Sequence, residues 1–334
     1  MYRERKTFYQ QLQAKRNSKV LVYVTGDRPG METRIASDVY DYFVNQLDRI
    51  GKASKISLYL YTRGGDTLAA WSIINLIHQF SDDVEIIVPS KCHSAGTLMS
   101  LGASRIVMTK QATLGPIDPS VNHPLNPQIP GAPPDAKVPV SVEAIEGFIQ
   151  LAKEECISTR KANSDAILSI LSQKIHPLVL GQVYRARAQI RMLAARLVVR
   201  QVKDKKMIDK IIKFLSSQSG SHDYTIHRRE ARDELGLNIE KPDDSLYAII
   251  KNIYDDIEKE MELASKFDPN SYMGADQVKP YNFRRCIIES IDGGSYYFSS
   301  EGTMSRQQIQ AQPGVLQNVI QDKRSFEGWK YEKD

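Results

Sequence analysis

The first 110 residues alternate short apolar runs with stretches of helical periodicity. Four runs predict strands: Val20–Val24, Lys55–Tyr61, Val84–Val88 and Arg105–Met108. Between them, the spacing of apolar side chains predicts helices over Asp38–Leu47, Thr67–Phe80 and Ser94–Gly102. Strands and helices that alternate in this way are typical of repeated β-α-β units with a mainly parallel sheet. The expected fold class is therefore α/β.

The pattern changes in the second part of the chain. Eight prolines fall between residues 116 and 139, which argues against regular structure there and indicates an ordered surface loop. Helical patterns follow over Ser141–Leu171, Leu178–Val202, Met207–Leu215, Ile226–Leu235 and Ser245–Phe267. Arg285–Asp292 and Ser295–Ser300 flank a Gly-Gly pair, and this predicts a β-hairpin.

Length and composition indicate a globular chain in two parts. The chain has 334 residues, 41% of them hydrophobic and 25% charged, and no apolar run approaches the length of a membrane span. We expect an α/β domain over residues 1–240 and an accessory α+β element, a helix and a hairpin, over residues 241–334. The N-terminus lacks the apolar segment of a secretory signal, so we expect a cytoplasmic protein without membrane contact.

Cysteine and histidine spacing argues against metal chemistry. The three cysteines, Cys92, Cys156 and Cys286, are far apart, so we expect reduced thiols and neither a disulfide framework nor a zinc site. The six histidines include no HExxH pair. We therefore expect no metal and no other cofactor.

One stretch of the chain is strongly basic. The formal net charge is only +5, but Tyr184–Lys213 contains ten Lys or Arg residues against two Asp residues. Such a stretch is compatible with a nucleic-acid or acidic-partner surface. It also leaves a continuous apolar face made of Ile190, Leu193, Ala194, Leu197 and Val198. Since no nucleic-acid-binding motif accompanies the charge, we favour a packed amphipathic helix with a solvated basic side and do not expect nucleic acid as a partner.

Three segments of the first part contain groups that could take part in catalysis. In Thr62–Asp66, two glycines directly after a strand expose backbone N–H groups that can hold an oxyanion. Ser94 lies on a strand-to-helix turn among small residues, the setting of a nucleophile elbow, although the pentapeptide is Cys-His-Ser-Ala-Gly. Asp118 is fixed within a Gly-Pro-Ile-Asp-Pro turn.

Each segment alone has a simpler interpretation as a turn, a phosphate cradle or a helix cap. Together they are more informative. Consecutive strands of a parallel sheet place the Gly-Gly donors and the serine side by side at one edge.

These segments resemble the Clp-protease and crotonase fold group, and more closely the serine dehydrogenase proteinase family within it. The matching residues are Thr62–Asp66, Ser94–Thr97, Gly115–Pro119, Ser221–Ile226 and Glu230–Leu237, and the resemblance runs from about residue 18 to about residue 240. It implies a Clp-like fold of repeated β-α-β units and serine endopeptidase activity on peptides or unfolded proteins.

The resemblance also implies roles for individual residues. Ser94 is the expected nucleophile, Asp118 the orienting carboxylate and His222 the general base. Gly64 or Gly65, with the backbone N–H of Ala95, is expected to form the oxyanion hole. Clp-type subunits have histidine roughly where Asp118 stands and the aspartate later in the chain, so the two roles are exchanged here.

The general base has two alternatives. His123 lies on the proline-rich loop, 29 residues after Ser94. Lys137 is the candidate for a Ser-Lys pair, because the related signal peptide peptidase A uses lysine as its base. Both alternatives remain open at this stage, with His222 favoured.

Two other functions remain possible: a crotonase-like acyl-CoA enzyme, which would leave Ser94 idle, and a non-catalytic protein-binding scaffold. The fold group implies a homo-oligomer. Because the chain has no GxxxxGK[ST] phosphate-binding motif, an energy-dependent unfoldase or adaptor would be a separate partner.

Overall fold

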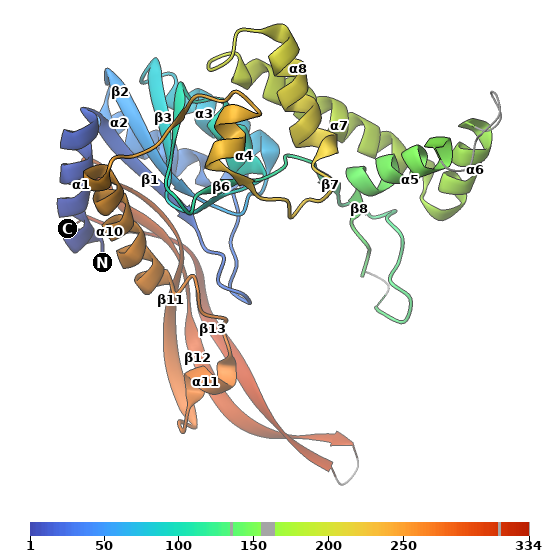
Figure 1. The fold of residues 1–334 in the computed structure, drawn as a ribbon. Helices are drawn as coiled ribbons and strands as arrows, with labels where there is room; N and C mark the ends of the chain where they lie inside the picture. Colours follow the sequence, from blue (N-terminus) through green and yellow to red (C-terminus); the bar gives the residue numbers. More distant parts are fainter. Residues whose placement is uncertain (134–135, 155–163, 313–314, 334) are drawn as a thin grey trace.

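The structure is a computed structural model that describes residues 1–133, 136–154, 164–312 and 315–333. Its centre is an eight-stranded sheet with the order β10-β5-β3-β2-β1-β11-β12-β13 (Figure 1). Its parallel half consists of β1 (Lys19–Thr25), β2 (Lys55–Tyr61), β3 (Asp83–Val88), β5 (Arg105–Met108) and β10 (Ile239–Glu240). Its antiparallel half consists of β11 (Val278–Ser290), β12 (Gly294–Gln312) and β13 (Val315–Glu332).

Helices cover both faces of the parallel half. One face packs against α2 (Tyr40–Ile50), α3 (Thr67–Ile77) and α4 (Ala95–Leu101), and the other against α1 (Tyr2–Arg16) and α10 (Asp244–Met261). Along β1, Leu21 and Tyr23 contribute to the first core, and Val20, Val22 and Val24 to the second. Because both faces are buried, the strands are apolar along nearly their whole length rather than alternating.

A small second sheet lies beside the large one. It consists of β4 (Lys91–Cys92), β6 (Thr113–Leu114) and β9 (Ile226–His227), with β6 in the middle. β4 and β6 are parallel, whereas β6 and β9 are antiparallel. This sheet ties together three segments that are far apart in the sequence.

A helical lobe extends from the body around the N-terminal half of α7 (Figure 1). It contains α5 (Val142–Glu154), α6 (Ser164–Lys174), α7 (Pro177–Val198) and the short paired strands β7 (Ser120–Val121) and β8 (Val140–Ser141). The second half of α7 packs on the main core through Ile190, Leu193 and Leu197. Its first half packs against β7 and β8 through Val179 and Val183. The apolar face expected within the basic stretch is thus buried.

The segment after α7 returns to the body. It forms α8 (Lys205–Lys213), a π-helical turn (Phe214–Gln218) and α9 (Arg228–Asp233) before β10. Among the described helices, none is long and apolar enough to cross a bilayer.

The C-terminal strands form an arm. β12 and β13 continue well beyond the body as a two-stranded ribbon (Figure 1). The short helix α11 (Pro269–Met273) packs at its base, where Met273, Tyr281 and Met304 form a small core. The predicted hairpin is therefore present as β11 and β12, but each strand is longer than predicted.

The expected α/β class, with a mainly parallel sheet and a C-terminal α+β extension, is confirmed. The four predicted strands are β1, β2, β3 and β5, and the helices predicted between them are α2, α3 and α4. The elements that were not predicted include α1, which is largely polar, the short strands of the small sheet, and β13, which completes a three-stranded antiparallel unit.

Three local predictions need correction or lie outside the description. Ile226 and His227 form β9 rather than the start of a helix, because they pair with β6. The proline-rich segment contains β7, since its residues 120 and 121 are not prolines and can pair with β8. Of the helix predicted over Ser141–Leu171, α5 and α6 are present. Residues 155–163, which include Cys156, lie outside the described residues.

The division of the chain near Lys241 stays a prediction. β11 pairs with β1 in the central sheet, with Leu21 opposite Ser290. The segment after residue 240 therefore contributes a strand directly beside the first strand of the chain.

Candidate active site

The small sheet positions the three residues expected to act together. β4 ends two residues before Ser94, β6 ends four residues before Asp118, and β9 begins four residues after His222. Since β6 pairs with both β4 and β9, all three segments leave the sheet in one region. The structure thus brings together residues that are separated by more than a hundred positions.

Ser94 has an unusual backbone conformation. Its φ is 51° and its ψ is −113°, in a sparsely populated region for a residue other than glycine. It precedes α4, yet its side chain makes no capping hydrogen bond. The simpler interpretation of Ser94 as a helix cap therefore does not hold. Strained residues of this kind cost about 1–3 kcal/mol and are concentrated at functional sites.

Gly64 makes room for the Ser94 side chain. A Cβ at Gly64 would lie 2.6 Å from Ser94 Cβ and 3.1 Å from Ser94 Oγ. Its φ of 114° is also unfavourable for any other residue. The first glycine of the Gly-Gly turn is thus required by the close approach of the serine.

Asp118 and His222 are hydrogen-bonded to each other. His222 Nδ1 lies 2.8 Å from Asp118 Oδ1. The Asp118 side chain is almost fully buried, whereas half of the His222 side chain is exposed. The hydrogen bond to Asp118 is the main reason why the pKa of His222 is raised above its ordinary value, although partial burial opposes the shift. Because a carboxylate only accepts, Nδ1 carries the proton and Nε2 is left as the basic nitrogen.

These residues line one pocket of about 680 Å³. Gly64, Gly65, Ser94, Asp118 and His222 all contribute to its wall. The two alternative bases are not among the described residues of this wall. His123 Nδ1 accepts a hydrogen bond from Leu125 N at 3.1 Å. The backbone of Lys137 forms an isolated β-bridge with that of Gln128 within the proline-rich loop.

The two glycines of the Gly-Gly turn differ in whether their backbone N–H groups are already hydrogen-bonded. Gly64 N donates to Thr62 Oγ1 at 3.0 Å, and Asp66 N donates to Ile35 O at 2.8 Å. Within the described part of the chain, the N–H of Gly65 and that of Ala95, the first residue of α4, have no partner. The geometry therefore favours Gly65 with Ala95 as the pair of free donors.

Only glycine can stand at position 65. Its φ is 146°, and a Cβ there would lie 2.2 Å from Ile35 O. Segment 33–36 thus packs tightly against the Gly-Gly turn, and both line the pocket.

A second carboxylate near Asp118 was not predicted. Glu143 lies in the first turn of α5, and burial together with the charge of Asp118 raises its pKa. Ser219 Oγ also donates to Glu143 Oε1, at 3.4 Å. The pairing of Ser120 with Ser141 brings Glu143 close to Asp118, and no local sequence motif signals that pairing.

His93 has a packing role, as expected for a side chain that points away from its neighbour Ser94. Its Nε2 lies 2.8 Å from Thr113 Oγ1, and its ring fills the space beside Gly115. Burial is the main cause that lowers the pKa of His93 to about 4, so the ring is neutral at physiological pH.

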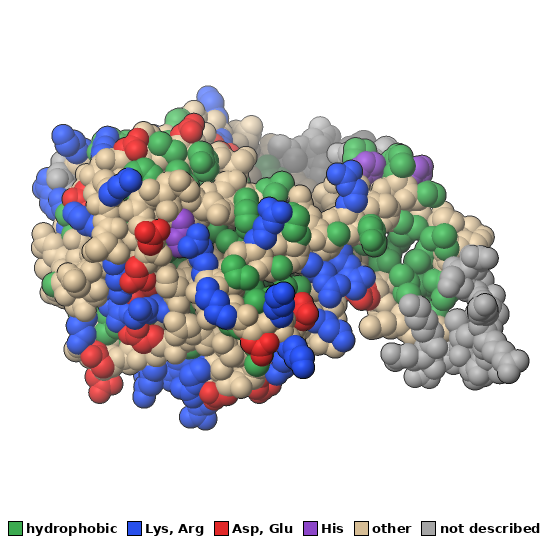
Figure 2. All heavy atoms as spheres, turned by 90° about the horizontal axis from the view of Figure 1, so that it is seen from above, with side chains coloured by type: hydrophobic (Ala, Val, Ile, Leu, Met, Phe, Trp, Pro, Cys, Tyr) green, Lys and Arg blue, Asp and Glu red, His purple; other side chains and the backbone are tan. Residues whose placement is uncertain are grey.

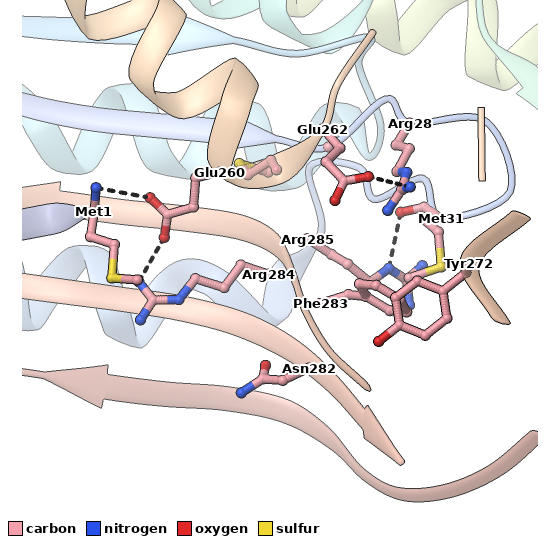
Figure 3. Close-up of a pocket in the computed structure, with 12 residues that line it drawn as sticks. Met1, Arg28, Met31, Glu260, Glu262, Tyr272, Asn282, Phe283, Arg284 and Arg285 are labelled. Atoms are coloured by element: carbon pink, nitrogen blue, oxygen red, sulfur yellow. Dashed lines mark hydrogen bonds and ion pairs between the residues drawn. The ribbon is translucent and has the colours of Figure 1, made fainter. Parts of the chain in front are cut away.

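Elsewhere in the described residues, no group of three or more His, Cys, Asp or Glu side chains is gathered as a metal ion requires. Another cavity, of about 430 Å³, lies where the end of α10 meets β11 (Figure 3). Its three arginines are paired with glutamates of the chain. Arg284 contacts Glu260 at 2.9 Å, and Arg28 forms an ion pair with Glu262.

Comparison with known sequences supports the family resemblance that the motifs indicate. Residues 2–132 match the sequence model of a family described as ClpP-like SDH-type serine proteinase. Two uncharacterized proteins of Methanocaldococcus jannaschii are similar. MJ0137 is 28% identical over 192 residues, which is 57% of this chain and 54% of that protein. MJ1495 is 35% identical over 66 residues, which is 20% of this chain and 23% of that protein. The chain thus matches about half of one relative and about a quarter of the other.

Solved structures of two proteases align with the chain at low identity. A variant of the 1510-N membrane-bound stomatin-specific protease is 18% identical, with 68% of this chain and 83% of that chain covered at a TM-score of 0.37. ClpP1 from Listeria monocytogenes is 16% identical, with 71% of this chain and 98% of that chain covered, also at 0.37.

Ser94 and Asp118 lie inside the matched segment, and His222 lies outside it. The resemblance that the sequence motifs indicate is confirmed for residues 2–132, and this part of the chain is related to the ClpP-like SDH-type serine proteinases.

Proposed function

We propose that the chain is a serine endopeptidase in which Ser94 is the nucleophile, His222 the general base and Asp118 the residue that orients the base. One observation carries the proposal. The hydrogen-bonded Asp118–His222 pair shares its pocket with a serine that has a strained backbone and no capping bond. Peptides or unfolded proteins are the proposed substrates.

The proposed reaction begins with attack of Ser94 Oγ on the scissile carbonyl carbon. A serine alkoxide does not form freely at neutral pH, so His222 Nε2 takes the proton as the C–O bond forms. Asp118 accepts a hydrogen bond from His222 Nδ1–H throughout, without taking the proton, and stabilises the imidazolium. The N–H groups of Gly65 and Ala95 are the proposed donors to the oxyanion.

Collapse of the tetrahedral intermediate breaks the C–N bond, and His222 gives its proton to the leaving amine. A water molecule then attacks the acyl-serine ester while His222 accepts one of its protons. The second collapse breaks the bond between the acyl carbon and Ser94 Oγ, His222 returns its proton to Oγ, and a carboxylic acid is released. The reaction consumes one water for each peptide bond and requires no cofactor.

The direct test is labelling by a fluorophosphonate probe, which reacts with an activated serine. We expect labelling and cleavage of an unfolded protein by the native chain, and loss of both in Ser94→Ala. Ser37→Ala is the matched control, because Ser37 lines the same pocket and is not assigned a catalytic role. Full labelling of the Ser94→Ala protein would refute the assignment. Tight binding of an acyl-CoA without serine labelling would favour the crotonase-like alternative.

A further inference from the structure

Two arginines line the pocket that contains Ser94. Arg34 and Arg63 both contribute to its wall, and both side chains are exposed. Within the described part of the chain, neither makes a hydrogen bond or an ion pair. Each guanidinium therefore keeps its full set of N–H donors.

The backbone places these arginines on neighbouring segments. Arg63 directly precedes the Gly-Gly turn, and Arg34 directly precedes Ile35. The two segments are joined by hydrogen bonds from Ile35 N to Gly64 O at 2.9 Å and from Asp66 N to Ile35 O at 2.8 Å. Both positions are thus fixed relative to the Gly65 N–H, the proposed oxyanion donor.

The carboxylates of the same pocket already have N–H partners. Glu32 Oε2 accepts from Gly30 N at 3.0 Å, and Asp66 caps α3 by accepting from Ala69 N at 2.7 Å. Asp118 accepts from His222. Each of these three carboxylates is thus held by a hydrogen bond within the chain, whereas among the described residues Arg34 and Arg63 are not.

The cavity in Figure 3 provides a contrast within the same molecule. Its three arginines, Arg28, Arg284 and Arg285, are all in ion pairs with glutamates of the chain. The charges of these three arginines are thus balanced by glutamates of the same chain. Those of the two arginines in the Ser94 pocket are not, although arginine forks match carboxylates in shape and charge.

We propose that the Ser94 pocket selects peptides that place a carboxylate close to the scissile bond, with Arg34 and Arg63 as the residues that bind it. The inference rests on the proposed peptidase function. The carboxylate has two possible sources, an Asp or Glu side chain of the substrate or the free C-terminus of a peptide.

The test uses pairs of unstructured peptides that differ by Glu against Gln at one position, scanned along the peptide. A second set compares a free C-terminal carboxylate with an amide. We expect kcat/KM to be higher for the carboxylate member of one set. The preference should fall about threefold to fivefold in Arg63→Gln or Arg34→Gln and about tenfold in the double variant, as exposed ion pairs of about 1 kcal/mol allow.

Arg229→Gln is the matched control, because Arg229 is an exposed residue of α9 that is not among the residues lining the pocket. It removes the same charge from the molecule and should leave the preference unchanged. A preference that falls equally in Arg229→Gln would reflect net charge alone and would overturn the inference.

Fluorophosphonate labelling separates this inference from the proposed function. If Ser94 is labelled and peptides are cut without preference for Glu or for a free C-terminus, the carboxylate inference fails and the peptidase function stands. If Ser94 is not labelled and no peptide is cut, the proposed function fails and the inference falls with it.

Discussion

At the scale of single residues, the backbone conformation of Ser94 explains how its hydroxyl is presented to the pocket. Hydrogen bonds hold the backbone on either side of Ser94, from His93 N to Thr62 O at 3.0 Å and from Gly96 N to His93 O at 2.8 Å. The strained φ of Ser94 is therefore imposed by its surroundings. In this conformation the side chain lies against Gly64, beside the free N–H of Ala95.

The raised pKa of His222 leads to a prediction about pH. The base must be neutral to accept a proton, so activity should rise with pH through a midpoint above about 6.5, the ordinary histidine value. The carboxylates of Asp118, Asp223 and Glu143 all act to raise this pKa. Asp118→Asn removes the largest contribution and should move the midpoint to lower pH, while kcat falls by about 10³-fold or more.

The pH dependence of kcat/KM, measured for the native chain and for each variant, checks this prediction. His222→Ala should lose several orders of magnitude, and His123→Ala should change neither the rate nor the midpoint. A large loss in His123→Ala, or an unmoved midpoint in Asp118→Asn, would show that another group is the base.

Sequence motifs identify the site residues that lie in short turns rich in glycine, proline or small residues, or in a segment that resembles the family. Ser94 and Asp118 stand in such turns, and His222 stands in a segment that resembles the family. Arg34 and Glu143 reach the same site only through pairings between distant segments, so the sequence around them contains no signal of their position. The choice of Gly65 over Gly64 as donor likewise depends on hydrogen bonds that only the structure reveals.

At the scale of elements, burial explains which strands and helices are predictable. The strands of the parallel half are apolar on both faces, and the helices between them show clear periodicity. Helix α1 is mostly polar and buries only Tyr2, Arg5, Tyr9 and Leu12. β13 contains few apolar residues at regular spacing. Both elements are held by partners far away in the sequence.

The attachment of α1 depends on a buried ionic cluster. Arg5 is fully buried, and its guanidinium contacts Glu289 of β11 at 2.7 Å and Asp256 of α10 at 2.5 Å. Tyr9 of α1 also donates to Glu289. The cluster therefore joins the first helix of the chain to α10 and to β11.

Substitution of Arg5 should destabilise the fold strongly. Arg5→Met leaves Glu289 buried without its cation, so we expect a loss of about 3–5 kcal/mol in the free energy of unfolding. Urea unfolding followed by circular dichroism measures it. Lys15→Met in the same helix is the control, because the ion pair of Lys15 with Asp243 is exposed, and the unfolding midpoint should hardly change. An equal effect of both substitutions would contradict the role of the cluster.

At the scale of the whole molecule, the helical lobe has several large apolar side chains that are mostly exposed to solvent. Figure 2 shows hydrophobic side chains gathered on the part of the molecule that extends away from the body. Leu168, Leu178 and Tyr184 are 60%, 64% and 73% exposed. Exposed apolar groups that lie together on one surface are typical of protein interfaces. We expect a second copy of the chain to cover them, in line with the homo-oligomer proposed from the sequence.

Light scattering tests this expectation. The native chain should have a mass above that of one chain, and Leu178→Lys with Tyr184→Lys should lower it. Val278→Lys is the control, since Val278 is 62% exposed on β11, away from the lobe. A native chain that is monomeric, or a double variant with unchanged mass, would exclude the lobe as the contact between copies.

The pairing of β1 with β11 has a consequence for synthesis in the cell. Leu21 is synthesised well before its partner Ser290, because the two lie far apart in the sequence. Until then β1 has an open edge on that side, and Arg5 lacks Glu289. Closing so long a loop is slow, and open strand edges aggregate, so the nascent chain is prone to aggregation until β11 has been made and has paired with β1.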